Sequence, residues 1–204
     1  MNAATPRLEG SIRKYLAPIL REDGFSGSGR CFRRSVGGFI HIVQVWGWRH
    51  GGEFTINIGI HPSALPDVLG NRVNLKKITV PDCEFSRVLT ETGVDQHWKY
   101  DRSTESMDAA VREATTVYLR AGRNMFSGFA GPNSPLCTVT PAQFDAGQFD
   151  FGGFEPPKVR TARNLALMRR ASGDVESARA FAAIALASLG SATDLREELE
   201  ELAR

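Results

Sequence analysis

The sequence predicts an α+β fold in which an antiparallel sheet of four or five strands packs against two helices. Apolar residues recur with the period of an amphipathic helix in residues 11–25 and again in residues 103–129. Between these helices, apolar and polar residues alternate with a period of two, which is typical of strands that bury one face. The connections are too short for parallel crossovers, so we expect antiparallel pairing.

The first predicted helix, SIRKYLAPILREDGF, is followed by the glycine-rich stretch GFSGSGR, which we interpret as a turn. Gly24 fits the left-handed residue that often ends a helix. Pro18 lacks a backbone N–H, so it should kink the helix or delay its regular part. The apolar stripe consists of Ile12, Tyr15, Leu16, Ile19 and Leu20.

Residues 39–61 predict a long β-hairpin after a short strand in RCFRRSV. A two-residue turn at Gly51-Gly52 is the shortest closure, and it places Val43 opposite Ile60. A four-residue loop would leave the same residues on each face, because only a shift of odd length exchanges the faces. We expect one face to be core, packed against the first helix, with Val43, Val45, Ile56, Ile58 and Ile60 on it.

The second face of this hairpin is too apolar to be fully solvated and too polar to be a simple core. It carries Ile40, Ile42, Gln44, Trp46, Trp48, Thr55, Asn57 and His61. A helix, a loop, a second subunit or a ligand could cover part of it, and later segments of the same chain are the favoured cover.

Three further elements complete the predicted domain, which spans residues 1–130. Residues 75–89 predict a strand interrupted at Pro81, which is typical of an edge or a bulge. Residues 93–101 predict a short strand, and residues 103–129 predict the second helix.

The rest of the chain divides into two parts. Residues 131–157 form an extended segment rich in Gly, Pro and Phe, and we expect its phenylalanines to dock on the domain; full disorder is the alternative. Residues 158–204 predict a helical appendage, made of a helical hairpin that turns at residues 172–174 and one more helix. The hairpin is similar to one tetratricopeptide-type pair, but a solenoid needs about three, so we expect a packing or dimerisation element.

Composition points to a folded, soluble chain. Of the 204 residues, 42% are hydrophobic and 24% are charged. There is no apolar run of the roughly 20 residues that span a bilayer and no signal-peptide pattern, so we expect a cytoplasmic protein without membrane contact. Cys31, Cys83 and Cys137 are scattered, and we expect three reduced, unbridged thiols. The net charge is +2, so nucleic acid is not an expected partner.

The stretches LAPILREDGF, CFRR, FTINIGI, DCEFSRVL and HWKYD resemble the bacterial domain-of-unknown-function family 4304 over about residues 7–130. The resemblance implies a leading helix that ends in Gly-Phe, a few antiparallel strands and a closing helix, in a bacterial, cytoplasmic setting. It implies no activity.

Catalytic and metal-binding patterns are missing from the sequence. Asp82 and Glu84 flank Cys83 and should raise its pKa, which opposes a nucleophilic role. The four histidines show no HxH or HxxxH spacing, so we expect no metal and no cofactor. The favoured function is a non-catalytic binding or interaction module. The alternative is a small enzyme whose site assembles on the sheet face around Cys83, His97 and His61.

For the binding module we expect a groove on the second face of the hairpin. Trp46, Asn57 and His61 should line it, with Arg87 and Trp98 as neighbours from later strands, because Trp and Arg are enriched at binding hot spots. The expected partner is another protein or a second copy of the chain; a small-molecule ligand is left open. In the competing interpretation, Trp46 and Trp48 pack beneath the phenylalanines of residues 128–157.

Overall fold

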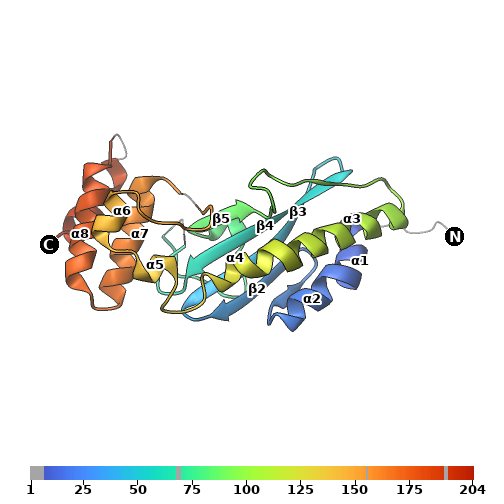
Figure 1. The fold of residues 1–204 in the computed structure, drawn as a ribbon, viewed down its shortest axis with the longest axis horizontal. Helices are drawn as coiled ribbons and strands as arrows, with labels where there is room; N and C mark the ends of the chain where they lie inside the picture. Colours follow the sequence, from blue (N-terminus) through green and yellow to red (C-terminus); the bar gives the residue numbers. More distant parts are fainter. Residues whose placement is uncertain (1–6, 68–69, 155, 191–192) are drawn as a thin grey trace.

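A computed structural model describes residues 7–67, 70–154, 156–190 and 193–204. It contains a six-stranded antiparallel sheet, two long helical segments on one face of that sheet, and a group of helices at one end (Figure 1). The predicted α+β class is therefore confirmed. The strand order is β1-β2-β3-β4-β5, and β6 also pairs with β4. The strands are β1 (Ser26–Ser28), β2 (Cys31–Val36), β3 (Phe39–Gly47), β4 (Glu53–Pro62), β5 (Phe85–Val88) and β6 (Trp98–Lys99).

Strand β1 lies within the glycine-rich stretch for which we expected only a turn. Gly27, in its middle, has a φ of +136°, and a Cβ there would lie 2.3 Å from the carbonyl oxygen of Cys31. Only glycine therefore allows this segment to pair so closely with β2.

The β3–β4 hairpin has a longer loop than the two-residue turn that we expected. Val43 lies opposite Ile58 rather than Ile60, and Gly47 lies opposite Phe54. The Trp48 N–H donates to the Glu53 carbonyl at 3.0 Å, so four residues, 49–52, form the loop. The predicted register is wrong by two residues, and because that shift is even, the predicted faces are correct.

The first helical segment runs through α1 (Leu8–Ser11), the π-helical turn η1 (Ile12–Leu16) and α2 (Ala17–Glu22). The expected irregularity at Pro18 takes the form of this wider turn just before it, which leaves room for a ring that would clash in a regular α-helix. Gly24 has a φ of +83° and ends the helix as expected. The Phe25 N–H donates to the Leu20 carbonyl at 2.9 Å, which completes a Schellman motif.

The second helical segment runs through α3 (Thr104–Val117), η3 (Tyr118–Gly122) and α4 (Arg123–Ser127), and it lies beside the first on the same face of the sheet (Figure 1). Asp108 of α3 links the two segments. Its carboxylate accepts hydrogen bonds from Ser11 Oγ at 2.7 Å, Lys14 Nζ at 2.8 Å and Tyr15 OH at 2.9 Å. These contacts hold the helices together over the core.

The main core lies between these helices and the first face of the sheet. We expected the Leu16 and Ile19 side of the first helix on this face; Leu16 is fully buried there, Ile19 is partly buried, and Leu20 is also fully buried. The core continues without a break into the C-terminal helices and ends at Leu202. Its members on β3 and β4 are Phe39, Val43, Val45, Phe54, Ile56, Ile58 and Ile60.

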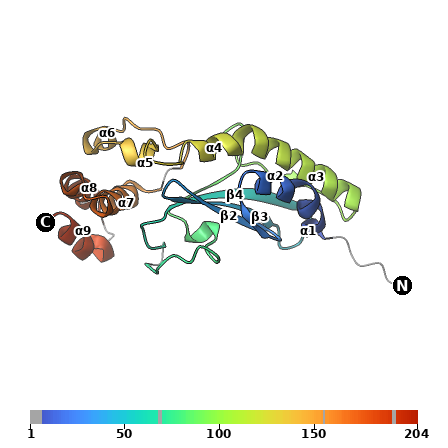
Figure 2. The same cartoon turned by 90° about the horizontal axis from the view of Figure 1, so that it is seen from below.

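The segment after α4 is docked rather than extended throughout. It contains two short helices, and Phe129, Phe144, Phe151 and Phe154 are buried. Figure 2 shows α5 and α6 continuing the layer of α4, with α7 and α8 next to them and α9 beyond. The helices are α5 (Pro135–Thr138), α6 (Pro141–Asp145), α7 (Lys158–Ala171), α8 (Val175–Ala187) and α9 (Arg196–Leu202), which follows the turn η4 (Thr193–Leu195).

We predict that Ile58→Ala lowers the free energy of unfolding by about 2–5 kcal/mol, because the fully buried side chain would leave a cavity in the core. Val94→Ala is a matched control, since Val94 is 72% exposed and should cost less than about 0.5 kcal/mol. Urea denaturation of both variants measures the difference. Equal losses would contradict the assignment of the core face.

His41 lies on the core face, is fully buried and stacks on Phe126. Its Nδ1 accepts a hydrogen bond from Arg34 Nε at 3.2 Å, so its Nε2–H donates to the Phe129 carbonyl at 2.8 Å. The ring is therefore held neutral, and burial lowers its pKa from 6.5 to about 4.

Because the unfolded chain binds a proton at His41 near pH 6.5 and the folded chain does not, stability should fall as the pH drops from 6.5 toward 4. We predict that His41 contributes about 2–3 kcal/mol to the loss between pH 7 and pH 4.5. His41→Gln should make that loss smaller by this amount, as measured by urea unfolding at both pH values. The same pH dependence in the variant and the wild type would refute the assignment.

Candidate binding surface on the second sheet face

The five residues expected at the site are divided between the two faces of the sheet. Trp46, Asn57 and His61 lie on the second face. Arg87 is in register with Ile58, and Trp98 is in register with Phe54, so both lie on the helix-covered face. The expected grouping of Arg87 and Trp98 with Trp46 is therefore wrong, because the registers of β5 and β6 against β4 place them on the other side.

Arg87 and Trp98 instead hold the core face together. The Arg87 guanidinium lies 5.9 Å from the centre of the Phe154 ring, and its Nη1 donates to the Gly152 carbonyl. Trp98 is 2% exposed and stacks on Phe54 with 5.5 Å between ring centres. Both side chains are used in packing.

One half of the second face is covered by the chain's own segment 73–83, which was the favoured cover. Figure 2 shows this segment on the side of the sheet opposite the helices. The strand predicted over residues 75–89 forms only in part. Pro81 lies in the 3₁₀ turn η2 (Val80–Asp82), and regular strand pairing begins only at β5. Residues of segment 73–83 form a second apolar cluster with the sheet: Ile40, Ile42, Ile78, Val80 and Cys83.

His61 belongs to a buried part of the second face. It is fully buried, and its Nε2 lies 3.2 Å from the Leu65 carbonyl oxygen. Burial lowers its pKa, so the ring is neutral near pH 7. His61 therefore does not line an open groove.

The residues of the alternative enzyme site do not come together. Cys83 is buried, and burial, followed by the charge of Asp82, raises the pKa of its thiol far above the ordinary value. His97 lies 3.7 Å from Glu53, at the far end of β4 from His61. His61 lies eight positions along β4 from Glu53, which is about 26 Å. Within the described residues, no group of His, Cys, Asp and Glu could hold a metal ion.

The other half of the second face is open. Trp46 is 43% exposed and Trp48 is 61% exposed. Trp46 lies opposite Thr55, and Glu53 lies opposite Lys99. We call this surface the open tryptophan face, and it consists of Trp46, Trp48, Glu53, Thr55, His97 and Lys99.

Asn57 borders the open tryptophan face. It is 5% exposed, and its Nδ2 donates to Thr55 Oγ1 at 2.9 Å. Its amide therefore positions the Thr55 side chain at the edge of the surface rather than meeting a partner directly.

The phenylalanines of residues 128–157 do not cover the tryptophans, so that interpretation is wrong. Phe151 packs on Phe85 with 6.4 Å between ring centres, and Phe144 packs on Phe181 of α8. Phe85 is opposite Ile60, five residues along β4 from Thr55, which is about 17 Å. The segment docks at the far end of the sheet.

The family model of a domain of unknown function, DUF4304, matches residues 16–121, just over half of the chain. The chain belongs to this family. The match includes all six strands, the α2 part of the first helical segment and most of the second, so the resemblance seen in the sequence is confirmed. No curated protein and no solved structure matches the chain. Among the described helices, none has the length and apolar character needed to cross a membrane.

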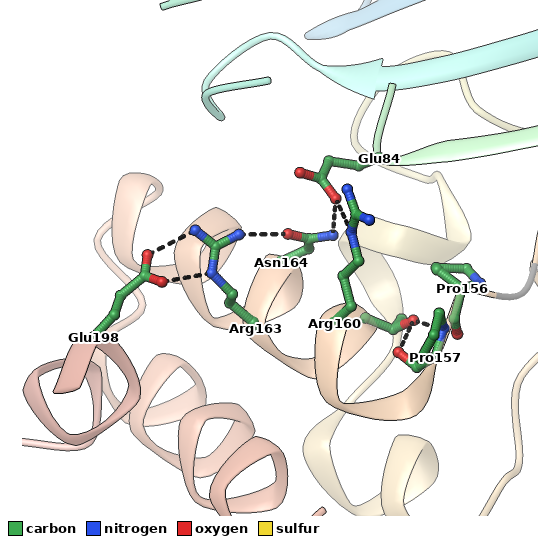
Figure 3. Close-up of polar contacts among 8 residues, drawn as sticks. Glu84, Pro156, Pro157, Arg160, Arg163, Asn164 and Glu198 are labelled. Atoms are coloured by element: carbon green, nitrogen blue, oxygen red, sulfur yellow. Dashed lines mark hydrogen bonds and ion pairs between the residues drawn. The ribbon is translucent and has the colours of Figure 1, made fainter. Parts of the chain in front are cut away.

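A partly buried polar network joins the DUF4304 domain to the helices that follow it (Figure 3). Glu84 comes directly before β5, and its side chain is 1% exposed. Its Oε2 accepts hydrogen bonds from Arg160 Nε at 3.0 Å and from Asn164 Nδ2 at 2.7 Å, both on α7. Arg163 of α7 donates to both carboxylate oxygens of Glu198 on α9, at 2.6 and 2.8 Å.

Sequence reasoning missed this network and part of the open surface. Glu84 and Asn164 are 80 positions apart, and no local pattern pairs them. His97 and Lys99 reach the tryptophan surface through β6, which is only two residues long. The alternation around Trp98 could have indicated this, because in a strand His97 and Lys99 lie on the face opposite to that of Trp98.

We predict that Asn164→Ala lowers the free energy of unfolding by about 1–3 kcal/mol, because the buried Glu84 carboxylate would lose a donor. Arg170→Ala is the control from the same helix. Its 3.8 Å contact with Glu201 is exposed and should contribute less than about 1 kcal/mol. Chemical denaturation compares the two, and equal effects would mean that the network does not stabilise the docked helices.

Proposed function

We propose that this DUF4304 protein is a non-catalytic binding module whose open tryptophan face binds another protein. The observation that carries the proposal is the exposure of Trp46 and Trp48, at 43% and 61%, while the third tryptophan, Trp98, is buried. Two neighbouring indoles left in water on a rigid sheet are costly unless a partner covers them.

The form of the surface favours a protein partner over a small molecule. Neither indole lines any of five clefts found among the described residues, which fits a flat protein-binding surface better than a small-molecule pocket. Tryptophan is enriched at the hot spots of protein interfaces. Glu53 and Lys99 place opposite charges beside the indoles, which would orient a partner of complementary charge.

A cytoplasmic location is part of the proposal, since a reducing compartment suits the three scattered cysteines. The enzyme alternative has less support, because Cys83 is buried and His97 and His61 lie at opposite ends of β4.

The test is affinity capture from a lysate of the native cells, with the full chain as bait, followed by calorimetry with the purified partner. We predict that the double variant Trp46→Ala, Trp48→Ala binds that partner at least about tenfold more weakly, because a hot-spot residue is worth about 2 kcal/mol or more. Its melting temperature should change little, because both side chains are exposed.

Val94→Ala is the control, because Val94 is also apolar and exposed but lies away from the tryptophans in sequence. It should bind like the wild type. Sedimentation of the wild type and the double variant at increasing concentration shows whether the partner is a second copy of the chain. A double variant that retains every partner and every oligomer of the wild type would refute the proposal.

A further inference from the structure

A cleft of about 560 Å³ lies where the start of the first helical segment meets the β3–β4 loop and the approach to α3. It is separate from the open tryptophan face, since neither Trp46 nor Trp48 lines it. Its volume falls in the range of roughly 300–1,000 Å³ that is typical of small-molecule sites.

The cleft has an apolar floor. Leu8 is 3% exposed and Met107 is 6% exposed, so both present only small apolar surfaces to the space. Tyr100 adds an aromatic wall, and its ring is held 6.1 Å from that of Phe54. This floor suits the apolar or aromatic body of a ligand.

The rim of the cleft is cationic. Arg7, Arg30 and Arg102 line it together with two carboxylates, Glu9 and Asp101. Both carboxylates are engaged: Glu9 Oε1 accepts from Arg30 Nε at 2.8 Å, and Asp101 Oδ1 accepts from the Ser103 N–H at 2.7 Å. Arg7 and Arg102 make no side-chain hydrogen bond or ion pair with any described residue. The charge of Arg7 acts on Glu9, but among the described residues the guanidinium donors of Arg7 and Arg102 are not used in hydrogen bonds and can bind an anion.

Arg30 is held in place for such a contact. Glu9 binds its Nε, while its Nη1 lies against Gly47, where an added Cβ would be only 2.6 Å away. Because Gly47 has no side chain, the Arg30 guanidinium can lie directly over β3. The two Nη groups keep donors that can bind the oxygens of a phosphate side by side.

We propose that this cleft binds a small organic phosphate, with the phosphate on the arginines and an apolar or aromatic body against Leu8, Met107 and Tyr100. The arginine forks match the geometry of phosphate oxygens, and the floor accounts for the organic part. This site is independent of the protein-binding surface proposed above.

The test is isothermal titration of the full chain with phenyl phosphate, inorganic phosphate and phenol as probes. We expect saturable binding of phenyl phosphate at one site, with weaker binding of inorganic phosphate and of phenol, because each of these contains only half of the ligand. Equal affinity for phenyl phosphate and inorganic phosphate would refute the role of the apolar floor. Absence of saturable phenyl phosphate binding would refute the site.

Arginine variants inside and outside the cleft distinguish direct contacts with the phosphate from a general effect of net charge. Arg102→Ala and Arg30→Met should each weaken phenyl phosphate binding by about tenfold, the value of one charge-assisted contact. Arg120→Ala removes the same charge from an exposed arginine outside the cleft, and it should bind like the wild type.

Gly47→Ala leaves the net charge unchanged but displaces Arg30, so it should also weaken binding while the fold, checked by circular dichroism, is kept. Loss of affinity in Arg120→Ala equal to that in Arg102→Ala would reduce the effect to net charge and overturn the proposal. Wild-type affinity in both Arg102→Ala and Arg30→Met would overturn it as well.

Discussion

Burial of the apolar face of the β3–β4 hairpin is the constraint on which the rest of this structure depends. Phe54, Ile56, Ile58 and Ile60 alternate along one strand, and all must leave water together. Two long helical segments cover that face, and Asp108 joins them to each other. The side strands β5 and β6 both attach to β4, so the hairpin also determines where Arg87 and Trp98 lie.

The second face of the same hairpin shows how one sheet can be both core and surface. Segment 73–83 approaches closely because position 59 has no side chain; a Cβ there would lie 2.7 Å from Cys83 Sγ. Beyond this cover, Trp46 and Trp48 stay exposed. The boundary between the closed and open halves falls near Asn57, whose amide bonds to Thr55.

The C-terminal helices are attached by polar as well as apolar contacts. A carboxylate as buried as Glu84 is tolerated only when it has donors, and α7 supplies two of them. Such a network is directional, so it selects one arrangement of α7 against the sheet, whereas the phenylalanine contacts nearby could be made in several arrangements. Helix α7, which lies outside the residues matched by the family model, therefore supplies the hydrogen-bond donors that Glu84, within the match, needs in order to be buried.

The sequence by itself determined the fold class, the positions of the long helices and the two faces of the hairpin, but not the short helices α5 and α6. Period-two alternation survives any even shift of register, so the faces of Ile58 and Trp46 were correct although the loop length was not. It also favoured docking of the phenylalanines over disorder, although it did not indicate where they dock.

Only the tertiary structure decided which surface stays open and which residues share it. Arg87 and Trp98 changed sides because the face of a short strand depends on its partner's register, which two to four residues cannot specify. The exposure of Trp46 depends on where segments 73–83 and 128–157 pack, and the pairing of Glu84 with Asn164 depends on an approach across 80 residues. Such contacts are non-local, and local sequence patterns carry no record of them.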